Sequence, residues 1–257
     1  YRARVFAPIE RYEGHGLIGI VDYGAGNIQS VMNALGFCGA KFCLARSPEE
    51  LLSCDKALLP GVGAFGEAME RLRASGMDAA IKEFVASGRY FLGICLGMQL
   101  LFEQSEEFGA RSGLGILPGR VVKFDKTKFN IRGAEFRSED MKFRSGGAKF
   151  NSDEAEPSNR SGQNFASAES LKIPHVGWNS AHFIKRSPIN AGLGEFEYLY
   201  FVHSYHVLCA REITLATTFY GYEFASAIWR ENVFAFQPHP EKSHDAGIKI
   251  IKNFTEL

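Results

Sequence analysis

The sequence lacks an excess of charge of either sign, and it lacks any apolar run long enough to span a bilayer. Its 257 residues carry 29 basic and 29 acidic side chains, for a formal net charge of zero. Dedicated nucleic-acid and membrane-surface binders usually carry a basic face. A membrane-spanning helix needs roughly 20 apolar residues, and residues 1–16 lack the apolar core of a signal peptide. We therefore expect no nucleic-acid partner and no membrane association.

Cysteine is scarce and unpaired in sequence. The five cysteines form no Cys-x-x-Cys motif, which argues against a structural zinc site. Their odd number favours reduced thiols in a cytoplasmic protein. The segment Tyr23–Asn27 (YGAGN) has only part of a dinucleotide fingerprint, because the third glycine and the acidic residue after the second strand are missing. We predict neither a metal nor a cofactor.

Phenylalanine, by contrast, is abundant, with 22 residues against 2 Trp and 9 Tyr. Four of them begin consecutive seven-residue units, FNIRGAE, FRSEDMK, FRSGGAK and FNSDEAE. The apolar positions of these units lie five and two apart, whereas a coiled coil needs spacings of three and four. Their glycines also weaken any helix. We interpret residues 125–170 as a flexible insertion; a partner-binding flap is the alternative.

The rest of the chain reads as one α/β domain. Between Leu17 and about Phe102, short β-rich runs alternate with helical patterns, which indicates a mostly parallel sheet flanked by helices. The expected strands are 17–22, 41–45, 56–60 and 89–94, and the expected helices are 27–36, 47–54, 65–87 (broken near Gly76) and 95–104. After Gly109 the β-rich segments predict added antiparallel strands, and an amphipathic helix ends the chain. We expect a domain over residues 17–257, preceded by an appendage at 1–16 and interrupted by 125–170.

The strongest chemical signal is GICLG, residues 93–97. Two glycines flank Cys95 between a predicted strand and a predicted helix, a pattern that projects a nucleophile from a sharp turn. The helix N-terminus favours the thiolate. The alternative is a buried core cysteine with incidental glycines.

A second signal is the His-Pro-Glu run at His239–Glu241. A cysteine nucleophile needs a base that takes its proton and later protonates the leaving group. A carboxylate two residues beyond the histidine can orient the imidazole and stabilise its charged form. We predict that Cys95, His239 and Glu241 act together.

The turn PGVG at residues 60–63 follows the third predicted strand and is expected beside the fourth. Its backbone can direct an N–H group at a developing oxyanion, together with the N–H of Leu96. Such turns are common, so this motif alone is weak.

Several segments, in order, resemble the triad (class I) glutamine amidotransferases: LPGVGAF, GICLGMQLLFEQSEE, PHVGWN, YFVHSYHV and PHPEKS. Within that family, VDYGAGN, PGVG and PHVGWN resemble the glutaminase subunits of imidazole glycerol phosphate synthase. The resemblance implies a flavodoxin-like fold and hydrolysis of the glutamine amide through a thioester on Cys95. His239 would be the general base and acid, and Glu241 its orienting partner.

The resemblance also implies the remaining site residues. The oxyanion hole would be formed by Val62, Gly63 and Leu96, and L-glutamine would be held by Gln99, Ser204, Tyr205 and Glu107. Ammonia would pass to a (β/α)₈ cyclase subunit, bound as a heterodimer, which makes imidazole glycerol phosphate and an aminoimidazole carboxamide ribotide in histidine biosynthesis. Asn27, Trp178 and Lys242 match positions that face this partner; core packing is the alternative for Trp178.

Three features depart from the family pattern. Pro238 precedes the catalytic histidine, and two flanking prolines remove backbone donors that would help to place it. The Phe repeat replaces a short connection before PHVGWN, and residues 1–16 have no counterpart. Two other functions stay open: a paralogue that supplies ammonia to another synthase, for example in surface-sugar amidation, and a non-catalytic partner-binding member of the fold.

Overall fold

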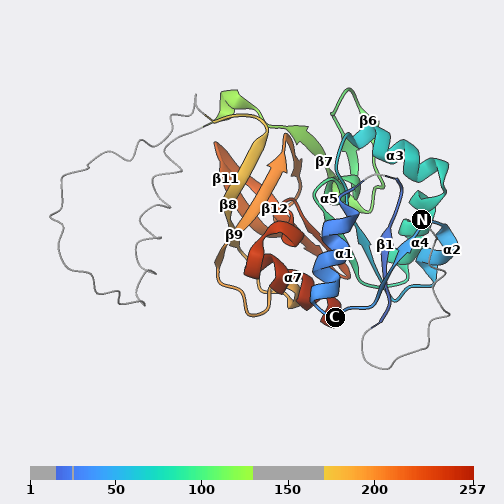
Figure 1. The fold of residues 1–257 in the computed structure, drawn as a ribbon. Helices are drawn as coiled ribbons and strands as arrows, with labels where there is room; N and C mark the ends of the chain where they lie inside the picture. The colour runs from blue at the N-terminus through green and yellow to red at the C-terminus, as the bar shows by residue number, and fades with distance from the viewer. Residues whose placement is uncertain (1–15, 25, 130–170) are drawn as a thin grey trace, which may run out of the picture.

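The computed structural model describes residues 16–24, 26–129 and 171–257, and these residues form one sheet with helices on both faces (Figure 1). The strands are β1 (Ile18–Val21), β2 (Phe42–Ala45), β3 (Lys56–Leu59), β4 (Phe91–Ile94), β5 (Phe102–Ser105), β6 (Arg111–Ser112), β7 (Leu117–Lys123), β8 (His175–Phe183), β9 (Phe196–His203), β10 (Tyr205–Leu208), β11 (Thr214–Tyr220), β12 (Tyr222–Arg230) and β13 (Val233–Phe236). The α-helices are α1 (Ile28–Phe37), α2 (Pro48–Leu52), α3 (Phe65–Ala74), α4 (Met77–Ala86), α5 (Leu96–Leu100) and α7 (His244–Glu256), and the short 3₁₀ turns are η1 (Lys126–Lys128), η4 (Pro188–Asn190) and η5 (Pro240–Lys242).

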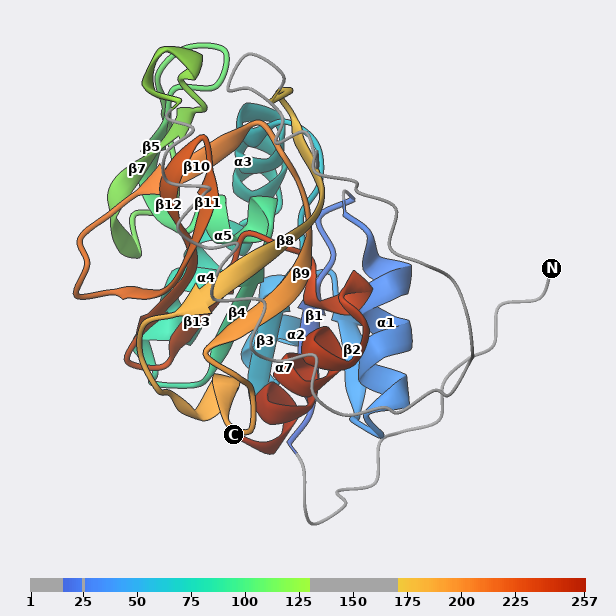
Figure 2. The same cartoon turned by 90° about the vertical axis from the view of Figure 1, so that its left-hand side faces the viewer.

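The sheet has a parallel half and an antiparallel half. Strands run in the order β2-β1-β3-β4-β13-β12-β10-β7-β5-β6, and β11, β8 and β9 continue from β12. The first five strands of that order pair in parallel, whereas β12 pairs with β13, β10 and β11 in antiparallel fashion. Figure 2 shows the antiparallel strands beside the parallel ones. The predicted α/β fold with an added β-rich part is confirmed.

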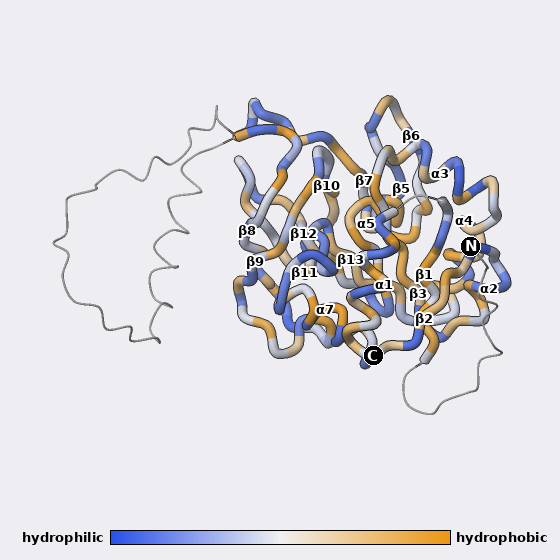
Figure 3. The backbone as a smooth tube through the Cα atoms, viewed as in Figure 1, coloured by the Kyte–Doolittle hydropathy of each residue, from blue (hydrophilic) through white to orange (hydrophobic). Residues whose placement is uncertain are grey.

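Side chains along the central strands point alternately to the two faces of the sheet, so each strand contributes to a hydrophobic core on both faces. In β1, Ile18 and Ile20 pack on the side of α1 and α7, while Val21 packs with α2, α3 and α4. In β3, Leu58 belongs to the first side and Leu59 to the second. Buried parallel strands with helices on both faces are apolar on both faces, and the tube through β1 and β3 is correspondingly hydrophobic (Figure 3).

Local signals placed most helix boundaries correctly. Ser47 caps α2 by accepting a hydrogen bond from the N–H of Glu50 at 3.3 Å, with Pro48 at the first helical position. Gly76 separates α3 from α4 with a left-handed backbone, φ 71°, a conformation that glycine adopts without steric cost.

Two predictions about secondary structure were wrong. The helix expected over 95–104 ends at Leu100, and Phe102 begins β5, which pairs in parallel with β7. A short apolar run fits a buried helix or a buried strand equally well, so periodicity could not separate them. The last β-rich segment was expected to be antiparallel, but its strand β13 is antiparallel only to β12 and runs parallel to β4.

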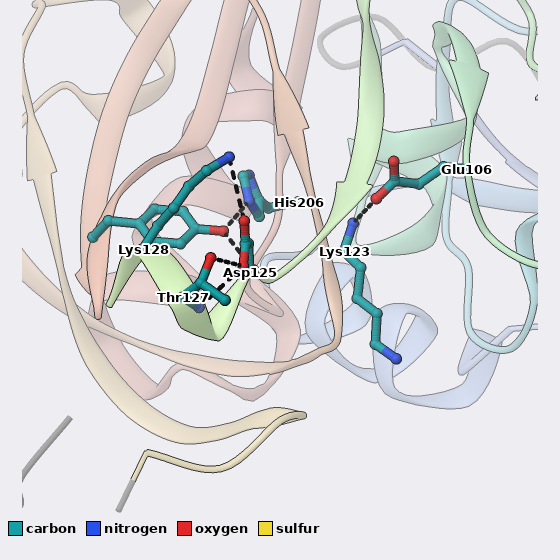
Figure 4. Close-up of polar contacts among 7 residues, drawn as sticks. Glu106, Lys123, Asp125, Thr127, Lys128 and His206 are labelled. Atoms are coloured by element: carbon teal, nitrogen blue, oxygen red, sulfur yellow. Dashed lines mark hydrogen bonds and ion pairs between the residues drawn. The ribbon is translucent and has the colours of Figure 1, made fainter. Parts of the chain in front are cut away.

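The first residues of the expected insertion form an ordered turn. Asp125 caps η1 by accepting hydrogen bonds from the backbone N–H and the hydroxyl of Thr127, at 3.0 and 2.6 Å, and it forms an ion pair with Lys128 at 3.4 Å (Figure 4). Phe129 then packs on Phe124. The rest of the insertion and residues 1–15 of the appendage lie outside the described residues, so the flexibility of the insertion stays a prediction. None of the helices in the described ranges is long and apolar enough to cross a membrane.

The close packing of α5 on β3 gives a stability prediction. A Cβ added at Gly97 would lie 1.9 Å from the carbonyl oxygen of Leu59, so Gly97→Ala forces the backbone apart and is expected to cost about 3 kcal/mol. Gly36 in α1 has open space around it, so Gly36→Ala is expected to stabilise by about 0.5 kcal/mol through helix propensity. Urea unfolding of both variants tests this. Equal stabilities would contradict the packing argument.

Candidate active site

Cys95 lies in a sharp turn between β4 and α5. Its backbone has φ 54° and ψ −111°, a conformation that costs energy in a residue with a side chain. A Cβ at Gly93 would lie 2.9 Å from the carbonyl of Gly97, so the flanking glycines leave room for the turn. The N–H of Cys95 donates to the carbonyl of Phe236 at 2.7 Å. The predicted nucleophile turn is therefore present, and it is fixed to β13.

His239 and Glu241 follow β13, the strand beside β4. Because both strands are parallel, their carboxyl ends meet at one edge of the sheet. Nδ1 of His239 lies 2.8 Å from a carboxylate oxygen of Glu241, and both side chains are almost completely buried. The N–H of His239 donates to the carbonyl of Tyr200 at 2.8 Å. With Pro238 before it, His239 is still held at two points, by this backbone bond to β9 and by the bond of its ring to Glu241.

The electrostatics of His239 suit acid–base chemistry. Burial by itself would lower the pKa of His239, but the neighbouring Cys95 and the Glu241 carboxylate outweigh that effect and raise the pKa to about 10. Nε2 of His239 is buried and has no hydrogen-bond partner within the described part of the chain. His239 lines the same cavity as Cys95, so this nitrogen is not committed to another group of the described chain.

A cavity of about 490 Å³ connects these groups with the other predicted site residues. Every residue predicted for the oxyanion hole and for glutamine binding lines it, together with Cys95 and His239: Val62, Gly63, Leu96, Gln99, Glu107, Ser204 and Tyr205. Glu241 lies behind His239. The sequence prediction missed five further lining residues, Phe108, Lys123, Pro174, Val202 and His203. Pro174 belongs to PHVGWN, Val202 and His203 belong to YFVHSYHV, and Phe108 directly follows GICLGMQLLFEQSEE. Their place in or beside these family motifs is the signal that could have identified them, whereas Lys123 has no such signal.

Gln99 is oriented by the protein. It is buried on α5, and its Nε2 donates to the carbonyl of Tyr205 and to Oε1 of Gln237, both at 3.0 Å. These bonds occupy both amide hydrogens, so the remaining capacity of Gln99 is that of an acceptor. An acceptor suits the ammonium group of an amino acid.

Glu107 is a second acceptor at the cavity. One of its carboxylate oxygens accepts from the N–H of Phe65 at 2.6 Å, which ties this loop to the start of α3. Ser204 forms the turn between β9 and β10, Tyr205 begins β10 and Lys123 ends β7, and all three line the cavity. Acceptors and donors are thus both present, as the recognition of a zwitterion requires.

The three residues predicted to face a partner lie outside the cavity. Asn27 precedes α1, and the exposed Lys242 ends η5, an element in contact with α1. Trp178 on β8 is 46% exposed and stacks on His244 with ring centroids 4.8 Å apart. Core packing of Trp178 is therefore wrong. These residues come from adjacent elements next to the site.

Comparison with known proteins identifies the family. The model of the family described as glutamine amidotransferase class-I matches residues 19–257. The subunit HisH of imidazole glycerol phosphate synthase from Sulfurimonas denitrificans is 48% identical, over 93% of this chain and 98% of its own length. The HisH subunit from Wolinella succinogenes is 46% identical, over 94% of this chain and 100% of its own.

Solved structures support the same fold at low sequence identity. One described as a glutamine amidotransferase has a TM-score of 0.61 at 16% identity and covers 93% of this chain and 99% of its own. The structure of PurLQS from Thermotoga maritima has a TM-score of 0.61 at 14% identity and covers 94% of this chain and 98% of its own. At this identity the likeness concerns the fold alone.

The full-length relatives confirm the predicted activity, a glutamine amidotransferase, and the narrower prediction of the glutaminase subunit of imidazole glycerol phosphate synthase in histidine biosynthesis. They favour that assignment over a paralogue serving another synthase. The chain therefore belongs to the class-I glutamine amidotransferases, among the relatives of the HisH subunits.

Proposed function

We propose that Cys95, His239 and Glu241 form the triad that hydrolyses the side-chain amide of L-glutamine, and that the ammonia passes to a (β/α)₈ cyclase subunit. The observation that carries this proposal is the arrangement around His239. Its Nδ1 is held by Glu241 at 2.8 Å, its Nε2 has no hydrogen-bond partner in the described part of the chain, and His239 and Cys95 line the same cavity. A carboxylate-oriented histidine with an uncommitted ring nitrogen, beside a cysteine, suits the role of acid–base for that nucleophile.

In the first half of the reaction the sulfur of Cys95 attacks the amide carbon, with its proton on His239. The tetrahedral oxyanion collapses to a γ-glutamyl thioester as His239 protonates the departing nitrogen, which leaves as ammonia. In the second half, water attacks the thioester while His239 accepts its proton, and glutamate and the Cys95 thiol result. Glu241 stabilises the charged imidazole in both halves.

The oxyanion would be bound at the start of α5. The N–H of Leu96 lies directly after the nucleophile, at a helix terminus, and Val62 and Gly63 line the same cavity. Gly63 has φ 98°, a conformation open to glycine, so this loop can present a backbone N–H. We assign the α-ammonium of glutamine to Gln99 and Glu107, and its α-carboxylate to the turn at Ser204 and Tyr205.

The partner would dock on the outward face of the β8–β9 hairpin, next to α1 and η5. Apolar side chains are exposed there on both strands: Val176, Trp178, Phe196, Tyr198 and Val202. The cross-strand register pairs Val176 with Val202 and Trp178 with Tyr200. An apolar patch of this kind on a protein surface marks a protein interface. Val202 belongs to this face and also lines the glutamine cavity, so ammonia formed at Cys95 is released beside the partner. We also place this enzyme in the cytoplasm.

The direct test is glutamine hydrolysis, measured as glutamate release, with and without the cyclase subunit from the same genome and its ribotide ligand. We expect low activity for the chain alone and strong stimulation in the complex. High activity alone would contradict the proposed coupling, and no activity with any cyclase would contradict the function. Unchanged function of the Cys95→Ala complex would favour a non-catalytic role.

A pH profile tests the role of Glu241. The pKa of His239, about 10, lies above its ordinary value of 6.5, so the imidazolium and the stability it contributes are fully present below about pH 6.5 and are lost as the pH rises through 10. Glu241→Gln removes the stabilising charge. It is expected to lower kcat by about 10²- to 10⁴-fold and to move the alkaline loss of activity to lower pH.

The control is Glu256→Gln, which removes an exposed carboxylate paired with Lys252 at 3.7 Å. It should leave kcat and its pH profile unchanged. An alkaline limb at the same pH in the wild type and in Glu241→Gln would show that Glu241 does not set the protonation of His239.

A binding measurement tests the docking face. Trp178→Ala is expected to raise the Kd for the cyclase at least tenfold, because exposed aromatic residues at the centre of an interface contribute about 2 kcal/mol or more. Phe37→Ala, at the far end of α1, removes another exposed aromatic residue and should not change that Kd. Calorimetric titration of both variants supplies the comparison, and equal affinities would place the interface elsewhere.

A further inference from the structure

A buried row of polar side chains begins at His203, which lines the glutamine cavity, and no step of the reaction uses it. Nδ1 of His203 lies 2.8 Å from the carbonyl oxygen of Tyr205, and Nε2 of His203 lies 3.0 Å from Nδ1 of His175. Nε2 of His175 lies 3.2 Å from Nδ2 of Asn179, which also donates to the carbonyl of Phe219 at 2.9 Å. The row runs from β8 through the end of β9 to the first residue of β10.

The hydrogen bonds fix the tautomer of each imidazole. A carbonyl oxygen only accepts, so Nδ1 of His203 carries a hydrogen. At the other end of the row Nδ2 of Asn179 only donates, so Nε2 of His175 accepts and the hydrogen of His175 is on Nδ1. Nε2 of His203 therefore accepts from Nδ1 of His175. Both histidines are therefore neutral, each with one donor and one acceptor in use.

The surroundings keep the pair uncharged and rigid. His175 stacks between the rings of Phe201 and Tyr220, with centroids 4.8 and 3.9 Å away. Burial lowers the pKa of His175 to about 4 and the pKa of His203 well below its usual range. In a buried site, a fully satisfied network of this kind holds its members in one geometry.

We propose that His203, supported by His175 and Asn179, is a positioning residue that fixes the Tyr205 carbonyl and with it the glutamine-binding turn. This inference rests on the proposed function. The same carbonyl accepts from Nε2 of Gln99, so the bond from His203 sets both the turn at Ser204 and Tyr205 and the direction in which Gln99 presents its acceptor. Loss of the bond weakens glutamine binding and leaves the triad intact.

The network also joins the cavity to the docking strand. His175 and Asn179 lie on β8, on the same strand as the exposed Val176 and Trp178. Side chains alternate along a strand, so the residues that support the glutamine turn lie between those that face outward. A backbone shift of β8 would therefore displace the Tyr205 carbonyl, because His175 and His203 connect the two by hydrogen bonds.

Two substitutions at one position separate the two bonds of His203. In His203→Asn the side-chain amide takes the place of Nδ1 and can donate to Tyr205, but it does not reach His175. In His203→Gln the longer amide takes the place of Nε2 and can accept from His175, but it offers no donor to Tyr205.

We expect the KM for glutamine to stay within about twofold of wild type in His203→Asn and to rise about tenfold in His203→Gln. The kcat of both should stay within about threefold.

The control is His206→Gln, which changes a buried histidine that bonds the hydroxyl of Tyr222 at 2.8 Å and does not line the cavity. Its KM should not change. Equal KM values for the two His203 variants, raised or not, would overturn the proposal, because a merely structural role makes both bonds equivalent.

A second pair covers the case in which a His203 variant does not fold. His175→Asn keeps a donor toward His203, whereas His175→Leu leaves Nε2 of His203 without one. The imidazole of His203 is then free to carry its hydrogen on Nε2 and to lose its donor to Tyr205, so only His175→Leu should raise KM. His203→Asn escapes this loss because an amide has no second tautomer. Calorimetric titration of glutamine into the Cys95→Ala chain with each substitution repeats both comparisons without turnover. Absence of hydrolysis by the wild-type complex would count against the proposed function, while equal glutamine affinities within each pair would count against the role of His203.

Discussion

The strained turn at Cys95 is the constraint on which the site depends. A positive φ at a residue with a side chain persists only where the surroundings enforce it. Here the enforcing contacts are the hydrogen bond from Cys95 to Phe236 at 2.7 Å and the close approach of Gly97 to Leu59. Both contacts come from strands that flank β4, so the nucleophile turn is a product of the sheet.

The same sheet order assembles the rest of the chemistry. Since β13 lies parallel to β4, the chain leaving β13 delivers His239 to the edge where Cys95 lies, although 144 residues separate them in sequence (239 minus 95). The antiparallel half then adds the turn between β9 and β10 as the opposite wall of the cavity. The outward face of β8 and β9 is left apolar beside that wall, where a partner would receive ammonia.

The sequence predicted the features that local chemistry determines. Glycine spacing identified the turn at Cys95, and Ser47 with Pro48 marked the start of α2. The sequence could not predict the features that depend on which strands lie side by side in the fold. Phe102 is compatible with a helix until β7 is placed beside it, and His203 acquires its role only because β8 brings His175 within 3.0 Å. Asp125 and Phe129 likewise extend the ordered chain into a segment whose composition suggested flexibility.

If Cys95 carries the acyl group, the γ-glutamyl thioester can be trapped during turnover. The complex is mixed with excess L-glutamine, quenched in acid during turnover, digested and analysed by mass spectrometry. We expect a γ-glutamyl group on the peptide that contains Cys95, sensitive to hydroxylamine and absent in Cys95→Ser. Turnover without any adduct in the wild type, or an adduct on another cysteine, would contradict it.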